Sequence, residues 1–381
     1  MQKLRWGLVG GGEGSQIGFT HRAAAQLDGH FYFDAGALDI DTEKSKSFGR
    51  KLGLTDQKSY GSWEEMLEKE KKLNKEKRLD LVTVATPNST HFEITKSFLK
   101  EDFNVLCEKP LTMTVEQAQE LVKLSKDMGK ICAVNYGYTG YPLVRQMRSM
   151  IMNGDLGDIR LVFAEFAGGF MADESDAQNP RVKWRFSAKH AGMAAITIDC
   201  GIHALNMACF VTDKKIVKVS SDFFSGIKSR ELEDDNLSSF RMENDVAGRL
   251  WTSGLAIGRT HGLTLQVFGS KGGLSWKQEQ PNQLFWTPIN DSTRIIERGH
   301  PNLYPSAKRI NKITIGHPEG MIAAFSNIYK DLFENINARK FDKNPSELSK
   351  SYPTVEDGCH SLEIVKAMKK SVSLNGSWAR V

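Results

Sequence analysis

The sequence contains few cysteines, and their spacing matches no binding motif. The chain of 381 residues has 5 Cys, an odd number, and no two of them form a C-x-x-C pair. This pattern indicates neither a disulfide framework nor a structural zinc site. We therefore expect a protein of a reducing, cytoplasmic compartment.

Targeting segments and membrane-spanning runs are also missing. Residues 1–5 lead directly into an apolar strand, without the hydrophobic core and cleavage site of a signal peptide. The most apolar long segment, residues 191–211, is interrupted by Asp199, His203 and Asn206. Polar and charged residues inside so short a segment argue against a membrane span. We expect no membrane partner.

Charge of one sign is not in large excess either. The chain carries 51 Lys and Arg against 46 Asp and Glu, a net charge of +5, and the basic residues form no stripe with interleaved aromatics. This balance gives no support for a nucleic-acid partner. Hydrophobic residues make up 40% of the chain, which is enough for folded cores, and the length predicts two or three domains.

Strand-like and helical segments alternate in the first third of the chain. Short apolar runs predict strands over residues 4–9, 31–38, 79–85, 104–107 and 131–134. Helical spacing of apolar residues lies between them over residues 17–27, 91–99 and 115–128. Such alternation predicts a parallel, doubly wound sheet of the dinucleotide-binding (Rossmann) type.

The pattern changes from about residue 160 onward. Short runs succeed one another with few helices and predict strands over residues 161–166, 217–223, 237–242, 246–251 and 263–268. Helices are expected over residues 142–152, 204–211 and about 355–373. We predict an N-terminal Rossmann domain over residues 1–137, then an α+β domain over 138–381 with a large, mostly antiparallel, open-faced sheet. The last helix is a candidate to pack back on the first domain.

A glycine-rich loop follows the first predicted strand. Residues 10–18 include Gly10 and Gly12 at the first two positions of a G-x-G-x-x-G pattern, with three extra residues before the closing Ile17-Gly18. Such a loop lets backbone N–H groups approach a pyrophosphate at a helix N-terminus, although an ordinary loop is the alternative. The residues of this loop expected to contact the cofactor are Gly10, Gly12, Ser15, Gln16 and Ile17.

Asp39 follows the second predicted strand, where an acidic side chain accepts hydrogen bonds from the adenosine ribose. No arginine follows it directly, so a 2′-phosphate would meet a negative charge. We therefore expect NAD as the cofactor, with NADP less favoured.

Three further motifs carry polar side chains. Thr86-Pro87-Asn88, with His91, and Glu108-Lys109-Pro110 each follow an apolar run at the carboxyl edge where doubly wound sheets bind ligands. We expect cofactor contacts from Thr86, Pro87, Asn88, His91, Glu108 and Lys109. Asp199-Cys200-Gly201-Ile202-His203 places a carboxylate and an imidazole four residues apart, on one face if a helix begins there.

With these motifs in this order, the chain resembles the glucose–fructose oxidoreductase/inositol dehydrogenase (Gfo/Idh/MocA) family over essentially its whole length. It looks most like a branch that contains levoglucosan dehydrogenase, because of residues 138–142 and the pair Trp184-Arg185. The glycine loop is longer than the family's usual loop. The resemblance implies an NAD(P)-dependent dehydrogenase that acts on CH–OH groups of a sugar, anhydrosugar or cyclic polyol, without a metal ion.

Oxidation of a secondary alcohol removes a hydride from carbon and a proton from oxygen. A histidine suits the proton transfer, and His203 is the predicted general base. An ammonium group stabilises negative charge that develops on the oxygen, a role that the resemblance assigns to Lys109. Asp199 is predicted to orient the substrate or support the imidazolium, although Asp is also a common helix N-cap.

Tyr138, Trp184 and Arg185 are predicted to bind the sugar together with Lys109, Asp199 and His203. Aromatic faces and planar donors suit sugars, but Tyr and Trp are equally common in protein cores. No third residue at ligand spacing accompanies Asp199 and His203, so no metal site is expected.

Two other functions stay open from the sequence. One is a glycosidase that oxidises and re-reduces its substrate with bound NAD, and the other is a non-catalytic NAD(H) sensor. Absorbance at 340 nm distinguishes them, because only a dehydrogenase accumulates NADH. The apolar side of residues 263–268, where Leu263, Leu265 and Val267 alternate with other residues, suggests a sheet that needs cover. We expect a homodimer or homotetramer.

Overall fold

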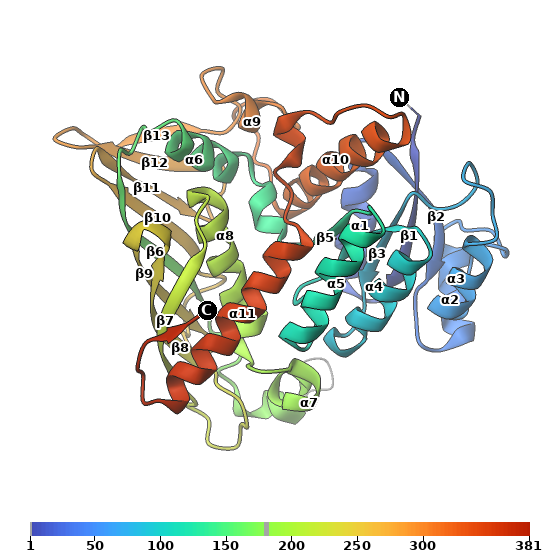
Figure 1. Ribbon diagram of the computed structural model, residues 1–381, viewed down its shortest axis with the longest axis horizontal. Coiled ribbons are helices and arrows are strands. Elements are labelled where there is room, and N and C mark those ends of the chain that lie inside the picture. The colour runs from blue at the N-terminus through green and yellow to red at the C-terminus, as the bar shows by residue number, and fades with distance from the viewer. Residues whose placement is uncertain (1, 179–182) are drawn as a thin grey trace. The chain divides into compact units, whose positions relative to one another are not determined.

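The computed structural model describes residues 2–178 and 183–381, and the chain folds into two compact units (Figure 1). The first unit contains Met1–Thr112, Glu116–Gly140 and Met321–Cys359. The second contains Met113–Val115, Tyr141–Gly320 and His360–Val381. The predicted border after residue 137 lies three residues before the passage from Gly140 to Tyr141, although the short segment Met113–Val115 already belongs to the second unit. The return of the chain to the first unit over 321–359 was not predicted beyond the suggestion that the last helix packs back.

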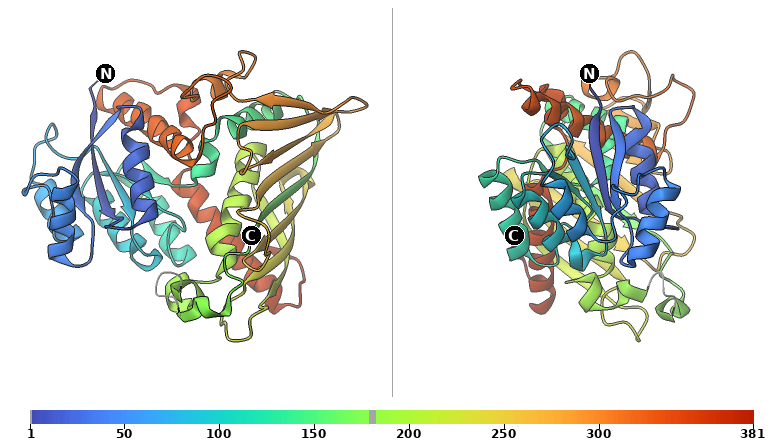
Figure 2. Two further views of the ribbon diagram at one scale, coloured as in Figure 1. Left: turned by 180° about the vertical axis from the view of Figure 1, so that it is seen from behind. Right: turned by 90° about the vertical axis from the view of Figure 1, so that its right-hand side faces the viewer.

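The first unit is built on a five-stranded parallel sheet in the order β2-β1-β3-β4-β5. Its strands are β1 (Leu4–Gly10), β2 (Phe31–Ala37), β3 (Leu81–Ala85), β4 (Asn104–Cys107) and β5 (Cys132–Val134). The helices that follow them are α1 (Gln16–Leu27), α2 (Thr42–Lys51), α3 (Trp63–Glu70), α4 (His91–Lys100) and α5 (Val115–Asp127). Helices lie on both faces of this sheet (Figure 2), which confirms the predicted doubly wound fold.

Helix α10 (Met321–Lys340) belongs to the core of the first unit. Tyr329 packs edge-on against Trp6 of β1, with ring centroids 5.9 Å apart, and Phe333 lies among the same buried residues. The helix also approaches the turn η2 (Gly137–Gly140) closely, because a Cβ on Gly137 would lie 2.1 Å from the Phe325 ring. The apolar face of α10 therefore brings residues from far along the chain into the first unit.

The second unit is built on a nine-stranded sheet in the order β13-β12-β11-β10-β6-β9-β8-β7-β14. Its neighbours pair antiparallel except for β6 and β9, as predicted for a mostly antiparallel sheet. The strands are β6 (Ile159–Ala167), β7 (Ile216–Phe224), β8 (Asp235–Met242), β9 (Ala247–Ser253), β10 (Leu263–Gly269), β11 (Gly272–Lys277), β12 (Gln283–Pro288), β13 (Arg294–Glu297) and β14 (Ala379–Arg380). Strands β11 to β14 have no counterpart among the strands predicted from the sequence.

Helices cover one face of this sheet (Figure 1). They are α6 (Pro142–Met152) and α8 (Ile202–Thr212), joined at the far end by the second half of α11 (Val355–Ser373). Leu263, Leu265 and Val267 of β10 are buried under them, whereas Gln266 is exposed, as the alternation predicted. Two shorter helices are α7 (Ala188–Ala191) and α9 (Pro305–Lys308).

Helix α11 starts with a reciprocal cap. The backbone N–H of Thr354 donates to the Asp357 carboxylate at 2.7 Å, and the Thr354 hydroxyl accepts from the Asp357 N–H at 3.4 Å. The next residue, Gly358, has no room for a side chain, because a Cβ there would lie 2.6 Å from Val134 of β5. Among the described residues no helix combines the length and the apolar run that a bilayer span requires.

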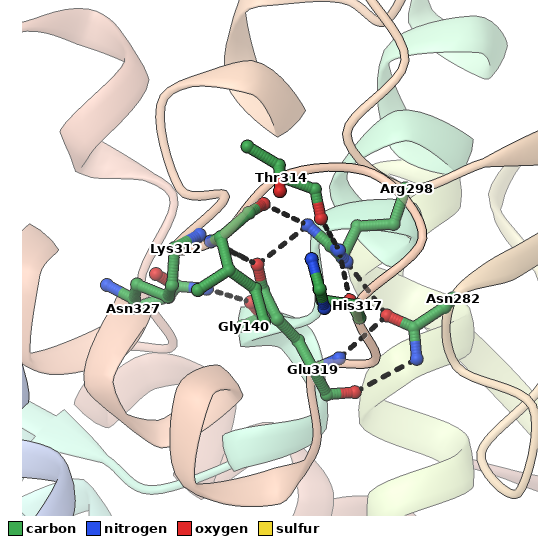
Figure 3. Close-up of polar contacts among 9 residues, drawn as sticks. Gly140, Asn282, Arg298, Lys312, Thr314, His317, Glu319 and Asn327 are labelled. Carbon is green, nitrogen blue, oxygen red and sulfur yellow. Dashed lines mark hydrogen bonds and ion pairs between the residues drawn. The ribbon is translucent and has the colours of Figure 1, made fainter.

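A buried ion pair closes the loop that follows β13 (Figure 3). The guanidinium of Arg298 donates to the Glu319 carboxylate at 2.7 Å and to the Asn282 side chain at 2.8 Å. It also donates to three backbone carbonyls of the loop, those of Ile313, Thr314 and His317. Glu319 accepts in turn from the N–H groups of residues 312 and 313. One arginine therefore fixes the whole turn.

Candidate active site

A cavity of about 510 Å³ lies at the carboxyl ends of β1, β2 and β3. Its lining includes Gly10 and Gly11 after β1, Asp39 after β2, and Thr86 and Pro87 after β3. Because β1 lies between β2 and β3, this is the point where the loops after neighbouring strands diverge. Open α/β sheets bind their ligands at such a point.

The glycine loop is tightly packed against the strand ends. Gly10 has φ of +82°, and a Cβ there would lie 2.4 Å from the carbonyl oxygen of Ala85. A Cβ on Gly12 would lie 2.6 Å from the Leu38 carbonyl oxygen. Only glycine fits at these positions, despite the extra residues in the loop.

Helix α1 then begins at Gln16, with Ile17 in its first turn. Ser15 is the N-cap, and its hydroxyl accepts from the Gly18 N–H at 3.1 Å. The helix N-terminus and the glycine-rich loop together suit a pyrophosphate. These features fit a dinucleotide.

The charge of the cavity suits an unphosphorylated ribose. Asp39 is half-buried in the wall, and Glu64 of α3 is a second acid there, whereas the described residues that line the cavity include no Lys or Arg. Asp39 is held in place because its carboxylate accepts from the Asp41 N–H at 2.9 Å. Ile40 and Trp63 add apolar surface, and neither was predicted from the sequence because neither belongs to a polar motif.

His91 lies beneath the cavity wall and does not line it. It is fully buried, with Nδ1 2.7 Å from the Pro110 carbonyl oxygen and Nε2 2.9 Å from the Thr86 carbonyl oxygen. Burial by itself favours the neutral ring, but the Cys107 sulfur and the two carbonyls raise the pKa of His91 to about 9. The structure therefore corrects the expected cofactor contact, because both ring nitrogens are occupied by backbone. Asn88 opens the short turn η1 (Asn88–Thr90) just before His91.

Glu108 is 8% exposed, and its side chain belongs to a network of hydrogen bonds. Its buried carboxylate accepts from Nε2 of His21 at 3.0 Å, from the Asn135 side chain and from the N–H of Lys109 at 3.1 Å. Burial alone would raise the pKa of Glu108, but the hydrogen bonds from His21 and Asn135 and the charge of Lys109 lower it. Lys109 itself is half-buried, and its peptide bond to Pro110 is cis.

The Asp199–His203 segment combines two kinds of helix. Residues Thr197–Gly201 form a π-helical turn, and α8 begins at Ile202. Single π-helical turns are frequent at functional sites. The Asp199 carboxylate accepts from Nε of Arg185 at 2.7 Å, so the structure brings together two of the predicted residues. His203 is buried, and its ring centroid is 6.1 Å from that of Phe166.

Glu233, which was not predicted from the sequence, supports this segment. Its buried carboxylate accepts from the N–H groups of Ala195 and Thr197, each at 3.0 Å. Burial raises the pKa of Glu233 despite these hydrogen bonds. Glu233 lies in an acidic run that looks like a solvated loop, and its partners are more than 30 residues away, so no local pattern marks it.

The two predicted aromatic residues are placed differently. Tyr138 lies in η2 of the first unit and is 8% exposed. Trp184 lies in the short turn η4 (Lys183–Phe186), but its side chain is outside the part of the chain that the structure describes.

Comparison with known proteins identifies the class to which this fold and site belong. Residues 4–136 match the family model described as "Oxidoreductase family, NAD-binding Rossmann fold", and residues 144–275 match the GFO/IDH/MocA C-terminal domain. The chain therefore belongs to the Gfo/Idh/MocA oxidoreductase family. It is an NAD-binding dehydrogenase of the class that acts on CH–OH groups.

Individual relatives match over nearly the whole chain. An uncharacterized oxidoreductase, YfiI, of Bacillus subtilis is 33% identical over 98% of this chain and 96% of its own length. Levoglucosan dehydrogenase of Pseudarthrobacter phenanthrenivorans is 24% identical over 88% of this chain and 90% of its own.

Two crystal structures of an inositol dehydrogenase homolog from Azotobacter vinelandii are similar as well, each 35% identical over 100% of this chain and 98% of theirs. The complex with NAD⁺ has a TM-score of 0.94, and the complex with NADH and myo-inositol has a TM-score of 0.91.

Proposed function

We propose that this protein oxidises a secondary hydroxyl group of a sugar, anhydrosugar or cyclic polyol with NAD. The observation that carries the proposal is the ion pair between Asp199 and Arg185, 2.7 Å long, on a segment that the buried Glu233 holds in place. A planar cation beside a carboxylate offers fixed donors and acceptors to a ring with several hydroxyl groups. The relatives that bind myo-inositol or are named for levoglucosan support the same substrate class.

The chemistry is divided among three side chains in this proposal. His203 takes the hydroxyl proton as general base, and Asp199 supports the imidazolium that forms. Lys109 stabilises the negative charge that develops on the substrate oxygen. Bound NAD supplies the hydride acceptor.

The first unit holds the cofactor in the proposal. The loop of Gly10, Gly12 and Ser15, with the start of α1 at Gln16 and Ile17, takes the pyrophosphate. Asp39 takes the adenosine ribose. Thr86 and Pro87, which line the cavity, contact the cofactor farther along together with Asn88. Tyr138 and Trp184 stay proposed substrate contacts, together with Arg185.

A substrate panel tests this function. The enzyme is incubated with myo-inositol, levoglucosan and a set of free sugars, each with NAD or NADP, and absorbance at 340 nm is recorded. We expect NADH to accumulate with at least one cyclic polyol or sugar, and to do so far more slowly with His203→Ala. A protein that binds NAD but reduces none of it with any of these substrates would contradict the proposal, and release of a sugar without NADH accumulation would indicate the glycosidase.

A further inference from the structure

Two fully buried histidines contact the residues on either side of Lys109 in the first unit. On one side, Nε2 of His21 lies 3.0 Å from the carboxylate of Glu108. On the other side, Nδ1 of His91 lies 2.7 Å from the carbonyl oxygen of Pro110. Neither ring has any exposed surface, so neither can touch a substrate or a cofactor. Each ring joins the turn that carries Lys109 to another part of the first unit.

The His21 contact continues into a chain of hydrogen bonds that crosses the core. Nδ1 of His21 lies 2.8 Å from the Tyr329 hydroxyl, which lies 2.9 Å from the Thr83 hydroxyl. The indole N–H of Trp6 donates to the same Thr83 oxygen at 2.9 Å. Indole can only donate and a carboxylate can only accept, and a neutral His21 ring, which donates through Nε2 and accepts through Nδ1, then gives one direction. Thr83 donates to Tyr329, Tyr329 to His21, and the Nε2–H of His21 to Glu108, and every group is then satisfied.

Glu108 connects this chain of hydrogen bonds to the backbone of Lys109. The oxygen of Glu108 that does not contact His21 accepts from the N–H of Lys109 at 3.1 Å. The carboxylate therefore cannot rotate to suit the lysine without breaking its bonds to His21 and Asn135. A hydrogen bond inside a buried network of this kind is costly to leave unmade.

His91 fixes the other end of the turn. Its second nitrogen lies 2.9 Å from the Thr86 carbonyl, so one ring joins the turn after β3 to the turn after β4. Both partners are carbonyl oxygens, which can only accept, so both ring nitrogens must donate. The ring therefore carries two protons and two charge-assisted hydrogen bonds, which are stronger than neutral ones.

We propose that His21 and His91 are positioning residues that hold the backbone of Lys109 in its working place. The proposal rests on the proposed role of Lys109 in the reaction. A long, flexible lysine side chain is effective only if its origin is fixed, because a displacement of about 1 Å can cost about 100-fold in rate. The chain of hydrogen bonds extends the positioning role to Tyr329. This residue lies on α10, which the polypeptide reaches only after the second unit.

The test compares variants of the full enzyme by kcat, KM, affinity for NADH and melting temperature. We expect His21→Leu and His91→Leu to lower kcat by about 10- to 100-fold while NADH affinity changes by less than about twofold. His21→Gln keeps one donor and one acceptor and should recover most of kcat. Tyr329→Phe removes only the hydroxyl group, should fold normally, and should lower kcat by several-fold.

The chain of hydrogen bonds also predicts that the effects of two substitutions on kcat are coupled, and a third histidine offers a control variant. Tyr329→Phe should cost little more in a His21→Leu background, because both changes break the same chain. His30→Gln removes another histidine beside α10, where His30 stacks on Phe333 with centroids 4.3 Å apart, and should leave kcat unchanged.

Three results would overturn the positioning role. The first is a normal kcat in folded His21→Leu and His91→Leu, and the second is a loss confined to NADH affinity. The third is a Tyr329→Phe loss that adds fully to that of His21→Leu. Lys109→Ala, measured in parallel, distinguishes a failure of the proposed role of Lys109 from a failure of the positioning role of the histidines. If it keeps full kcat, the proposed function of Lys109 fails and the positioning role fails with it. If it loses kcat while the histidine variants do not, only the positioning role fails.

Discussion

His91 and Pro110 are joined by a hydrogen bond of 2.7 Å between the imidazole Nδ1 and the proline carbonyl oxygen. The imidazole belongs to the first residue of α4, and the carbonyl belongs to the turn after β4. With its other nitrogen on the Thr86 carbonyl, the same ring joins two loops at the carboxyl edge of the sheet. His91, whose motif suggested a cofactor contact, therefore has a structural role: it holds two loops together.

This buried ring predicts a pH dependence of stability. The pKa of His91 is about 9 in the folded protein, above its ordinary value near 6.5. The folded state therefore binds the proton more tightly, and the stabilisation is complete below about pH 6.5 and is lost as the pH rises toward 9. We expect the free energy of unfolding to fall by about 1–3 kcal/mol across this window. In urea unfolding series from pH 6 to 9, His91→Gln should show a flatter profile. Parallel profiles for the two proteins would contradict a charged His91.

Cofactor preference should depend on Asp39. The unmodified enzyme should have a higher kcat/KM with NAD than with NADP, because a 2′-phosphate would meet this carboxylate. Asp39→Ala should weaken NAD binding by about 10-fold, the worth of a hydrogen bond to a charged group, and narrow the gap between the cofactors. Glu64→Gln is the matched control, since Glu64 lines the same cavity but lies on α3. Equal kcat/KM with both cofactors in the unmodified enzyme would refute the assignment.

Substitution of His203 and substitution of Lys109 should lower the reaction rate in two distinguishable ways. His203→Ala should lower kcat by about 10²- to 10⁴-fold, and a higher pH should restore part of it, because hydroxide can take the proton. Lys109→Ala should lower kcat without such recovery. The double variant should lose less than the product of both effects, because the two groups serve one proton transfer. Steady-state kinetics with one good substrate measures this. Near-normal kcat with raised KM in His203→Ala would make His203 a binding residue, and the base would then be sought at Lys109.

The ion pair of Arg298 and Glu319 should matter for stability. Both side chains are buried, and Arg298 also holds three loop carbonyls, so Arg298→Met should lower the free energy of unfolding by about 3–5 kcal/mol. Arg294→Met is the control, because Arg294 pairs with Asp291 on the surface and such pairs contribute about 0–1 kcal/mol. Calorimetry of both variants measures the difference. Similar melting temperatures for the two variants would show that the buried pair contributes no more to stability than the surface pair.

Self-association is expected through the outer face of the nine-stranded sheet. Phe163, Leu237 and Phe268 are each at least 37% exposed on this face, opposite to the helices, and large apolar exposure is uncommon in monomers. We propose a dimer or tetramer. Light scattering should show it at micromolar concentration, and Leu237→Glu should shift it toward smaller species. A monomer under these conditions would disprove the assembly.

Local pattern predicted the framework well in both units. The helices over residues 142–152 and 355–373 have the predicted bounds, and β10 buries the predicted alternate residues. Such elements are set by the period of apolar residues, which is a property of neighbours in the chain. The strands β11 to β13 were missed because each is only four to six residues long and mixes its apolar residues with Gly, polar or charged ones. Such strands form by pairing with a strand already in place.

The sequence by itself determined the Rossmann unit, the antiparallel sheet and the order of the glycine loop, Glu108-Lys109-Pro110 and Asp199–His203. Only the tertiary structure decided which of those polar residues face a cavity and which are buried, as the places of Asp39 and His91 show. It alone placed Tyr329 beside His21, and Glu233 under the Asp199 segment. The physical reason is that a hydrogen bond between residues distant in the chain leaves no period or spacing in the sequence. Such bonds form only when packed elements bring a donor and an acceptor together, and burial makes them costly to leave unmade.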